Sequence, residues 1–291
     1  MKLAVFNDHR VGVVENDMIY DVTAVLPESP GWPLTYMSSL IFAWDERKSA
    51  VLSARESASG IPLADVQLLT PSPAPAHIVA AAANYREHIA EMGVMGSGGR
   101  SMNELGFFLI APSSIQRPGG TVVLPRGSSR SFHHESELAV IIGRHCKNVD
   151  VESALDYVFG YSCLMDMTMR MTVDLREERS MRKSFDTFTP VGPWIVTADE
   201  VPDPQQLELA LYVNEERRQS ATTADMIVSI AQQIALASSV MTLQPGDILA
   251  TGTPSGVGEV LPGDVVRIEI ENVGGFSVSV EEAAEYAPVR F

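Results

Sequence analysis

Residues 131–144, SFHHESELAVIIGR, place two carboxylates directly in front of an apolar segment. Residues 138–143 are almost continuously apolar and rich in β-branched side chains, which predicts a buried β-strand. Side chains two positions apart on a strand share a face, so Glu135 and Glu137 point the same way. Two adjacent anions at the start of a buried strand require a cation, a shared proton or open water.

Length and charge narrow the class of protein. The 291 residues allow one large domain, or one large and one small. The formal net charge of -16 argues against nucleic acid or an anionic membrane as a partner. No segment reaches the roughly 20 apolar residues that span a bilayer, and the first residues lack the apolar core of a signal peptide. Cys146 and Cys163 have no metal-binding spacing. We therefore expect a cytoplasmic enzyme with reduced, buried thiols.

A proline-rich stretch divides the chain. Residues 70–77, TPSPAPAH, carry three prolines in eight positions and predict an extended linker. We place a small N-terminal domain at residues 1–72, with short strands and one modest helix between residues 33 and 57. The larger domain covers residues 73–291.

The larger domain is predicted to be rich in β-strands. Strands are expected at residues 107–111, 121–124, 137–142, 160–167, 192–197 and 207–214, followed by a hairpin around Gly274 and Gly275. Helices are expected at residues 151–158 and 223–239, the second capped by Thr222 or Thr223. This pattern predicts an α+β fold in which strands dominate.

His88 and Glu91 lie three residues apart in NYREHIAEMG, which is typical of a short helix that ends at Gly93. On a helix they share a face, so the carboxylate can orient the imidazole. Such a pair can act as a general base that activates water. The alternative is a surface histidine beside a surface glutamate.

Asp166, in CLMDMTMR, lies near the end of an apolar strand, where an unpaired charge is costly. With Glu135 and Glu137 it forms a set of oxygen ligands that suits Mg²⁺, Mn²⁺ or Ca²⁺ better than zinc. In the alternative reading, the glutamates face solvent and Asp166 caps a turn. His133 and His134 are further candidate ligands, although such histidines more often satisfy local hydrogen bonds.

Two turn-rich segments complete the candidate site. Lys183 precedes the aromatic loop SFDTFTPVGPW and offers an ammonium group to an anionic substrate, unless it is simply exposed. Residues 251–258, TGTPSGVG, follow a predicted strand, and their glycines permit close backbone approach. This loop lacks the lysine of a phosphate-binding loop.

Five segments, taken in chain order, resemble successive motifs of the fumarylacetoacetate hydrolase superfamily: NYREHIAEMG, HHESELAVIIGR, DYVFGYSCLMDMT, RKSFDTFTPVGPW and GDILATGTPSGVG. The resemblance covers about residues 75–280 and is closest to the branch of acylpyruvases and 2-hydroxyhepta-2,4-diene-1,7-dioate isomerases. It implies a mixed β-roll catalytic domain, a small N-terminal α/β domain and a homodimer. It also implies Mg²⁺ or Mn²⁺, with Ca²⁺ as a third candidate, bound by Glu135, Glu137 and Asp166.

The resemblance assigns further roles. His88 and Glu91 match a catalytic dyad, and Lys183 matches a catalytic lysine that contacts the substrate. The implied substrate contacts are Tyr85, Arg170, Thr187 and Thr253. Many relatives carry Arg-Asp-x-Gln where this chain has Arg170-Met171-Thr172-Val173, and many have a lysine where it has Ile110. Both departures are expected to make the pocket more apolar.

These roles lead to a proposed reaction. We expect hydrolysis of a carbon–carbon bond in a 2,4-dioxo acid, such as an acylpyruvate or fumarylpyruvate, to pyruvate and a carboxylic acid. His88, oriented by Glu91, would deprotonate water, and the metal and Lys183 would stabilise the pyruvate enolate. Residues 93–105, rich in Gly and Ser, are expected to form a mobile lid. The alternatives are a decarboxylase or isomerase of a 2-oxo or 2-hydroxydienoic diacid in aromatic catabolism, and a paralogue that binds without turnover.

Overall fold

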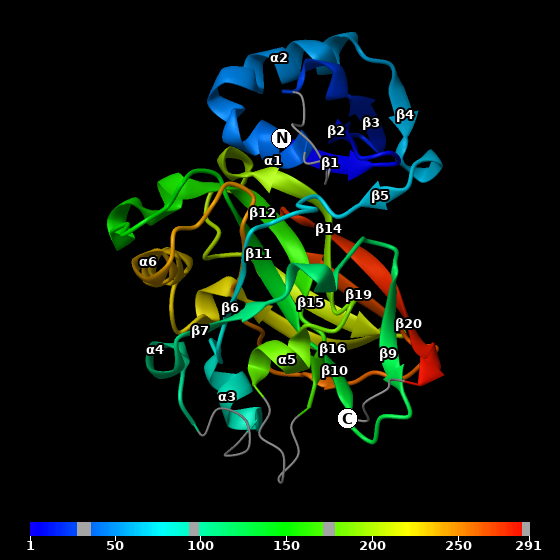
Figure 1. Cartoon of the computed structure of the whole chain (residues 1–291), viewed down its shortest axis with the longest axis vertical. Helices are drawn as coiled ribbons and strands as arrows, with labels where there is room; N and C mark the ends of the chain where they lie inside the picture. The colour runs from blue at the N-terminus through cyan, green and yellow to red at the C-terminus, as the bar shows by residue number, and fades with distance from the viewer. Residues whose placement is uncertain (28–35, 93–98, 171–177, 287–291) are drawn as a thin grey trace.

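The computed structural model describes residues 1–27, 36–92, 99–170 and 178–286 (Figure 1). Strands dominate these residues and form one long sheet, a second sheet of five strands and a small sheet of three. Most strand pairs are antiparallel. The parallel pairs are β6 (Ile78–Ala81) with β17 (Ile248–Ala250), β8 (Ile115–Gln116) with β14 (Thr189–Thr197), and β9 (Thr121–Arg126) with β20 (Gly274–Tyr286). The prediction of a β-rich α+β fold with mixed sheets is confirmed.

The long sheet runs from the N-terminal strands into the middle of the molecule. Its order is β4-β3-β2-β1-β14-β12-β11-β17-β6-β7, with β5 beside β1 and β8 beside β14. Its strands are β1 (Lys2–Phe6), β2 (Arg10–Glu15), β3 (Met18–Asp21), β4 (Gly60–Pro62), β5 (Leu68–Leu69), β6 (Ile78–Ala81), β7 (Phe107–Ile110), β8 (Ile115–Gln116), β11 (Ser136–Ile142), β12 (Val158–Met165), β14 (Thr189–Thr197) and β17 (Ile248–Ala250).

The two smaller sheets cover one face of these central strands. The five-stranded sheet has the order β16-β15-β19-β20-β9, and the three-stranded sheet has the order β13-β10-β18. Their strands are β9 (Thr121–Arg126), β10 (Phe132–His134), β13 (Thr168–Met169), β15 (Glu208–Val213), β16 (Glu216–Thr222), β18 (Gly258–Glu259), β19 (Val265–Ile270) and β20 (Gly274–Tyr286). The predicted C-terminal hairpin is confirmed, because β19 and β20 pair antiparallel on either side of a short turn.

Strand β11 is buried on both faces, as its continuous apolar run predicts. Leu138 and Val140 pack into a core shared with the five-stranded sheet. Ala139 and Ile141 pack into a second core with the N-terminal residues. Each fully buried Leu, Val or Ile side chain stabilises the fold by about 1.5–3 kcal/mol. Because a slip of one residue would exchange the two faces, this packing also fixes the direction of Glu137.

The helices are short and lie around the sheets. They are α1 (Tyr36–Phe42), α2 (Trp44–Ser57), α3 (Arg86–Met92), α4 (Met102–Leu105), α5 (Arg179–Lys183) and α6 (Ile230–Val240). The single helix predicted between residues 33 and 57 is two helices, because Ala43 leaves the helical conformation at φ -99 and ψ 18. Within the described ranges, no helix has both the length and the apolar content that a bilayer span requires.

The helix predicted at residues 151–158 is present as a 3₁₀ helix, η4 (Val151–Tyr157). The other predicted helix needs correction. The helix predicted from residue 223 begins at Ile230, since Ser229 forms the capping box by accepting the Gln232 N–H. Thr222 caps only a 3₁₀ turn, η6 (Thr223–Asp225).

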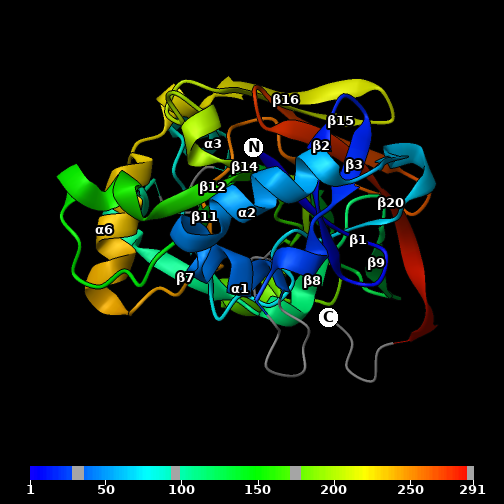
Figure 2. The ribbon, with the colours of Figure 1, turned by 90° about the horizontal axis from the view of Figure 1, so that it is seen from above.

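The N-terminal residues are joined to the central strands. Leu3 of β1 pairs with Ile195 of β14, and Leu40 of α1 shares a core with Ile141 of β11. Figure 2 shows α1 and α2 lying over the central strands when the molecule is seen from above. Residues 70–77 connect β5 and β6 without helix or strand, and bends at residues 71–74 replace the extended linker that the prolines predict. The division into domains at residues 72 and 73 stays a prediction, because both parts share a sheet and a core.

Candidate metal and catalytic site

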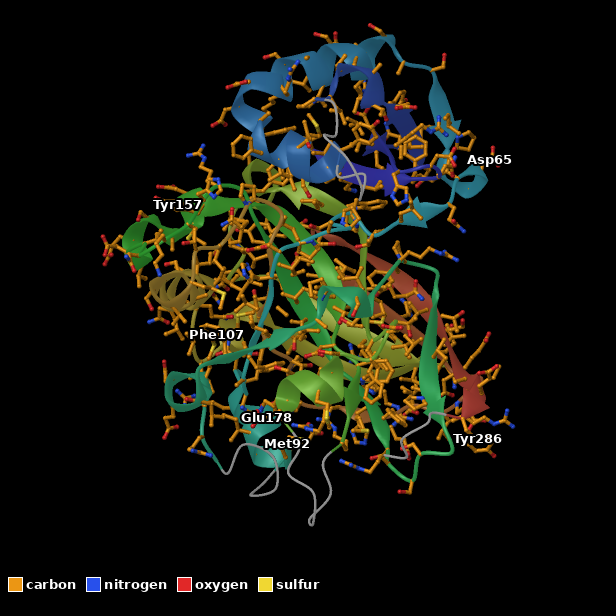
Figure 3. The ribbon with its side chains drawn as sticks, in the orientation of Figure 1. Asp65, Met92, Phe107, Tyr157, Glu178 and Tyr286 are labelled. Atoms are coloured by element: carbon orange, nitrogen blue, oxygen red, sulfur yellow. The ribbon has the colours of Figure 1, made fainter. Side chains whose placement is uncertain are left out.

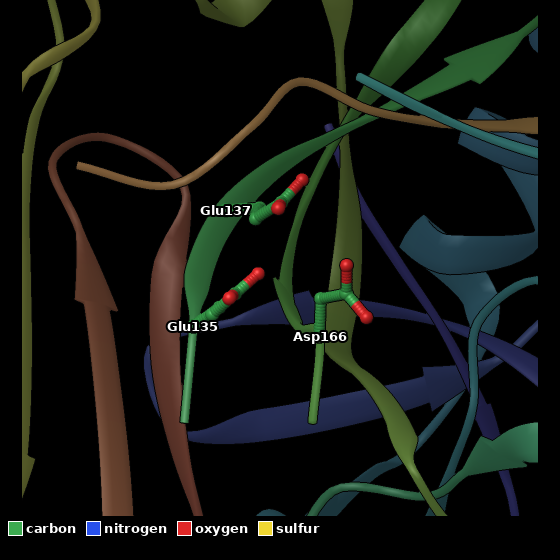
Figure 4. A group of neighbouring side chains, drawn as sticks. All are labelled: Glu135, Glu137 and Asp166. Atoms are coloured by element: carbon green, nitrogen blue, oxygen red, sulfur yellow. The ribbon is translucent and has the colours of Figure 1, made fainter. Parts of the chain in front are cut away.

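Three buried carboxylates meet at one end of β11 and β12 (Figure 4). Glu135 lies between β10 and β11, Glu137 lies on β11, and Asp166 directly follows β12. The antiparallel register brings the Asp166 N–H within 2.9 Å of the Glu135 carbonyl oxygen. One carboxylate oxygen from each residue lies within 4.8 Å of the others. The structure therefore assembles the trio that the sequence predicts.

Two cations contact this trio directly. The Lys183 ammonium donates to Glu135 Oε2 at 2.8 Å, to Thr168 Oγ1 at 2.7 Å, and to Asp166. The Arg170 guanidinium lies 2.8 Å from Glu135 Oε1. Burial would raise the pKa of Glu135, but Lys183 and Arg170 outweigh it and hold this pKa below its ordinary value. Glu135 is therefore a carboxylate anion between two cations.

Among the described residues, no cation makes an ion pair with Glu137. Its Oε2 accepts the Gly252 N–H at 2.7 Å. Burial raises the pKa of Glu137 well above its ordinary value, and the charge of Asp166 raises it further. The trio therefore holds one more carboxylate than the adjacent side chains can compensate.

The residues present fit a divalent metal ion. Asp166 Oδ1 is buried and accepts no hydrogen bond from the described residues. A buried carboxylate oxygen without a partner is costly. Three carboxylates without a sulfur ligand suit a hard cation, and a charge of two compensates the surplus anion. Of a cation, a shared proton and open water, the structure therefore favours a cation as the group that accommodates Glu135 and Glu137.

We expect Mn²⁺ or Mg²⁺ to raise the melting temperature of the protein, because only the folded chain assembles the trio. At 100 times the dissociation constant, binding stabilises the fold by about 2.7 kcal/mol, a shift of several degrees. Glu137→Gln should remove most of the shift, whereas Glu208→Gln, on the exposed start of β15, should keep it. Thermal denaturation with and without metal measures this, and an equal shift in both variants would contradict the site.

His88 and Glu91 share one face of α3, as their spacing predicts. His88 Nδ1 lies 3.5 Å from Glu91 Oε2, the outer limit of a hydrogen bond. Both oxygens of Glu91 lie 3.1 Å from the Gly256 nitrogen, which fixes the carboxylate. The His88 side chain lines the same cavity as the trio. Burial lowers the pKa of His88, so its imidazole is neutral and can accept a proton.

The loop at residues 251–256 connects the dyad to the trio. The Gly252 N–H binds Glu137, and the Gly256 N–H binds Glu91. Gly252 has φ +98, and a Cβ there would lie 2.7 Å from the Asn84 Cβ. Gly256 has φ +91, and a Cβ would lie 2.0 Å from a backbone oxygen. Only glycine fits at both positions, which explains the glycine pattern of this segment.

The predicted substrate contacts fall into two groups. Arg170 and Thr253 line the cavity, whereas Tyr85 and Thr187 are not among the described residues that line it. The Thr187 hydroxyl instead accepts the Val123 N–H at 2.8 Å, at a backbone φ of 72. Tyr85 is buried, and burial and Glu137 raise its pKa. The substrate roles of Tyr85 and Thr187 remain predictions.

Two further expectations concern the surroundings of the cavity. Ile110 packs into the second core and is not among the described residues that line the cavity, so the predicted effect of this departure on the pocket remains a prediction. Met171, Thr172 and Val173 lie outside the described residues. So does the first part of the predicted lid, residues 93–98, whereas its later part contains α4 with a capping box from Ser101. The lid remains a prediction.

Gln219 is a residue that the sequence analysis missed. It is fully buried on β16, and its Oε1 accepts the Ser136 N–H at 3.0 Å. Its Nε2 donates to Thr253 Oγ1 at 2.8 Å and to the Pro254 carbonyl at 2.9 Å. Because the Thr253 oxygen accepts from Gln219, the Thr253 hydroxyl hydrogen remains available to a ligand in the cavity. The polar sequence of β16 gave no signal of this contact.

The cavity above the trio has a volume of about 310 Å³. It lies between α3 and α5, at the end of the molecule where Met92 and Glu178 are labelled in Figure 3. Apolar side chains of Ile89, Met92 and Phe108 line part of it. Arg179 and Arg182 of α5 also line it, and neither was predicted as a site residue. The cavity thus combines an acidic metal site, a neutral imidazole and several cations.

The sequence of this chain matches a known protein family and its members. The family model described as fumarylacetoacetate (FAA) hydrolase C-terminal matches residues 77–281. A maleylpyruvate hydrolase of Aquipseudomonas alcaligenes is 40% identical over 289 residues, which cover 96% of this chain and 99% of that protein. This relative therefore matches nearly the whole chain, the N-terminal part included.

Two solved structures are informative. The maleylpyruvate hydrolase from Sphingobium sp. SYK-6, in complex with manganese(II) and pyruvate, has a TM-score of 0.86 and 45% identity, covering 97% of this chain and 100% of that one. A 2-hydroxyhepta-2,4-diene-1,7-dioate isomerase from Mycobacterium marinum has a TM-score of 0.74 and 31% identity, covering 98% and 100%.

Proposed function

The chain belongs to the fumarylacetoacetate hydrolase family, and we propose that it is a metal-dependent hydrolase that cleaves a carbon–carbon bond in a 2,4-dioxo acid. The products would be pyruvate and a carboxylic acid. One observation supports this most strongly: His88, paired with Glu91, lines the same cavity as the carboxylate trio. The relative named maleylpyruvate hydrolase and the pyruvate complex of its counterpart agree with this reaction.

The side chains have distinct tasks in this reaction. His88 accepts a proton from the attacking water, and Glu91 orients the imidazole and stabilises its charged form. Thr253 donates its hydroxyl to the substrate carboxylate, because Gln219 already donates to the Thr253 oxygen. Lys183 provides a fixed ammonium group for negative charge that develops on the substrate. Bound at Glu135, Glu137 and Asp166, a divalent cation supplies Lewis-acid polarisation of substrate oxygens.

The metal, the assembly and the compartment belong to the same proposal. Manganese in the Sphingobium structure supports Mn²⁺, and Mg²⁺ suits the same oxygen ligands. An exposed edge supports a homodimer, because β7 ends the long sheet with an apolar sequence in which Leu109 is 40% exposed. Two free, buried cysteines support a reducing compartment such as the cytoplasm.

An isomerase or decarboxylase is the second candidate. The similarity to a 2-hydroxyhepta-2,4-diene-1,7-dioate isomerase supports it. Decarboxylation of a 2-oxo acid needs a group that stabilises the resulting enolate, but no attacking water. For a decarboxylase the trio and Lys183 would be essential, whereas Glu91 would have little effect on the rate. An isomerase would still need a base, such as His88, to move the proton.

A substrate panel tests the assignment. The metal-loaded protein is incubated separately with acetylpyruvate, maleylpyruvate and oxaloacetate. The loss of diketone absorbance, the formation of pyruvate and the release of carbon dioxide are measured. The hydrolase assignment requires diketone loss with one pyruvate per substrate, and a chelator should stop the reaction. Release of carbon dioxide from oxaloacetate without cleavage of either diketone would favour the second candidate.

A further inference from the structure

One extended segment presents alternate residues to the cavity, namely Ser131, His133, Glu135 and Glu137. Two residues between them face the other way. Phe132 packs against Phe188 in the core shared with the five-stranded sheet. His134 is buried, and its Nδ1 lies 3.3 Å from Gln219 Oε1. This alternation is the period of two of an extended chain, and it places His133 on the same face as two members of the trio.

His133 has no described partner, in contrast to His134. Its Nδ1 is buried and forms no hydrogen bond with the residues that the structure describes. The ring lines the cavity, and it stands apart from the trio whose ligand atoms lie within 4.8 Å of one another. An imidazole carries at least one N–H in both its neutral and its charged form. A buried polar group without a partner is costly, so this ring is available to a ligand in the cavity.

The neighbours of His133 define where that ligand atom lies. His133 of β10 is directly opposite Thr168 of β13, and residues paired in this way lie side by side on one face. Thr168 Oγ1 accepts from the Lys183 ammonium at 2.7 Å. Along its own strand, His133 is two residues from Glu135, a rise of about 6.6 Å. His133 is therefore one step beyond the trio, beside the lysine that contacts it.

The proposed substrate has a polar group at this step. Its 2-oxo acid end is held at the trio and at Thr253, which also lines the cavity. The next polar group along a 2,4-dioxo acid is the carbonyl at C4, two bonds beyond C2. The same carbon is attacked by the water that His88 activates, and its oxygen then becomes negatively charged. A hydrogen-bond donor aimed at that oxygen stabilises the charge.

We propose that His133 donates a hydrogen bond to the C4 oxygen of the substrate and stabilises the negative charge that develops on it. Water adds to C4 as His88 takes its proton, and the π electrons of the C4 carbonyl move onto its oxygen. The C3–C4 bond then breaks, the carbonyl re-forms, and the electron pair of the bond passes to the pyruvate fragment. The proton on His88 moves to C3, which completes pyruvate. His133 keeps its own proton throughout. This role in turnover rests on the proposed function.

Binding tests the contact without turnover. Titration calorimetry of the Mn²⁺-loaded protein compares two 2-oxo acids of equal length and charge. They are 4-hydroxy-2-oxopentanoate, which has an oxygen at C4, and 2-oxopentanoate, which has none. The wild type should bind the hydroxy acid about 3–10-fold more tightly, the effect of one neutral hydrogen bond. His133→Leu should abolish the difference by weakening only the hydroxy acid. His133→Gln, which keeps an N–H donor, should restore part of it. His145→Leu, at an exposed histidine, should preserve the wild-type ratio.

Kinetics separate a contact with the substrate from a structural role. His133→Leu should lower kcat for acetylpyruvate by about 10²–10³-fold, the usual loss when one donor to an oxyanion is removed. The inhibition constant of pyruvate should stay at its wild-type value, because pyruvate has no C4 atom. A residue that only supported the fold would change the pyruvate constant as well.

The outcomes separate this inference from the proposed function. Equal binding of both acids by the wild type would overturn the role of His133. Equal weakening of both acids by His133→Leu would also overturn it, because the residue would then support Glu135 or Arg170 instead. The thermal shift on adding Mn²⁺ verifies that each variant folds and keeps the trio, and His133→Phe replaces the leucine variant if that variant does not fold. A wild type that prefers the hydroxy acid but cleaves no acylpyruvate would refute only the hydrolase.

Discussion

Replacing Asp166 by asparagine is expected to lower kcat/KM for acylpyruvate cleavage by about 10³-fold, since a metal ion contributes several kcal/mol to such a reaction. Asp166 Oδ1 is the buried oxygen without a hydrogen-bond partner among the described residues, and its other oxygen contacts Lys183. Asparagine has nearly the same shape but no charge. The variant should therefore fold, bind metal weakly and lose most of its activity.

Metal content after dialysis and steady-state kinetics measure the two effects together. Asp65→Asn, at an exposed aspartate in the N-terminal part, is the matched control and should retain both metal and activity. High metal concentration should restore part of the activity of the Asp166 variant. A fully active variant that retains a full complement of metal would contradict the role of Asp166.

His88→Ala should reduce kcat for the same cleavage by about 10²–10⁴-fold, the usual contribution of a positioned general base. Glu91→Ala should cost less, because it removes only the group that orients the imidazole. The double variant should be little worse than His88→Ala, since the two residues act as one unit. Metal affinity should be unchanged in all three, because neither residue belongs to the trio.

His145→Ala provides the control for the dyad, as His145 is exposed and is not among the described residues that line the cavity. Its kcat should equal that of the wild type. The dyad would have to be reassigned if His88→Ala kept near wild-type kcat for acylpyruvates. Additive losses in the double variant would also show that His88 and Glu91 act separately.

The features that local sequence encodes were predictable. A continuous apolar run specifies a doubly buried strand, and its period fixes the side on which Glu137 lies. The spacing of His88 and Glu91 gives one face of α3 without any tertiary information. The sequence also predicts that the adjacent anions Glu135 and Glu137 require a cation. The structure supports this, because the register of β11 and β12 places Asp166 beside them.

Features that depend on distant contacts were not predictable. Gln219 holds Thr253 across 34 positions, and nothing in the polar sequence of β16 indicates that its side chain is buried. The start of α6 was placed too early, because both Thr222 and Ser229 have capping chemistry and only the fold selects between them. Arg179 resembles a surface residue in sequence, and it is the packing of α5 beside the trio that places it in the cavity.

A single-turnover reaction in H₂¹⁸O tests the central assignment most directly. The wild-type protein is loaded with Mn²⁺ and mixed with acetylpyruvate, with the protein in excess. The reaction is then quenched, and the released acetate is analysed by mass spectrometry. Attack of a water activated by His88 on the distal ketone predicts one ¹⁸O in each acetate formed. Carbon–carbon cleavage without ¹⁸O in the acetate, or no acetate at all, would contradict a hydrolase.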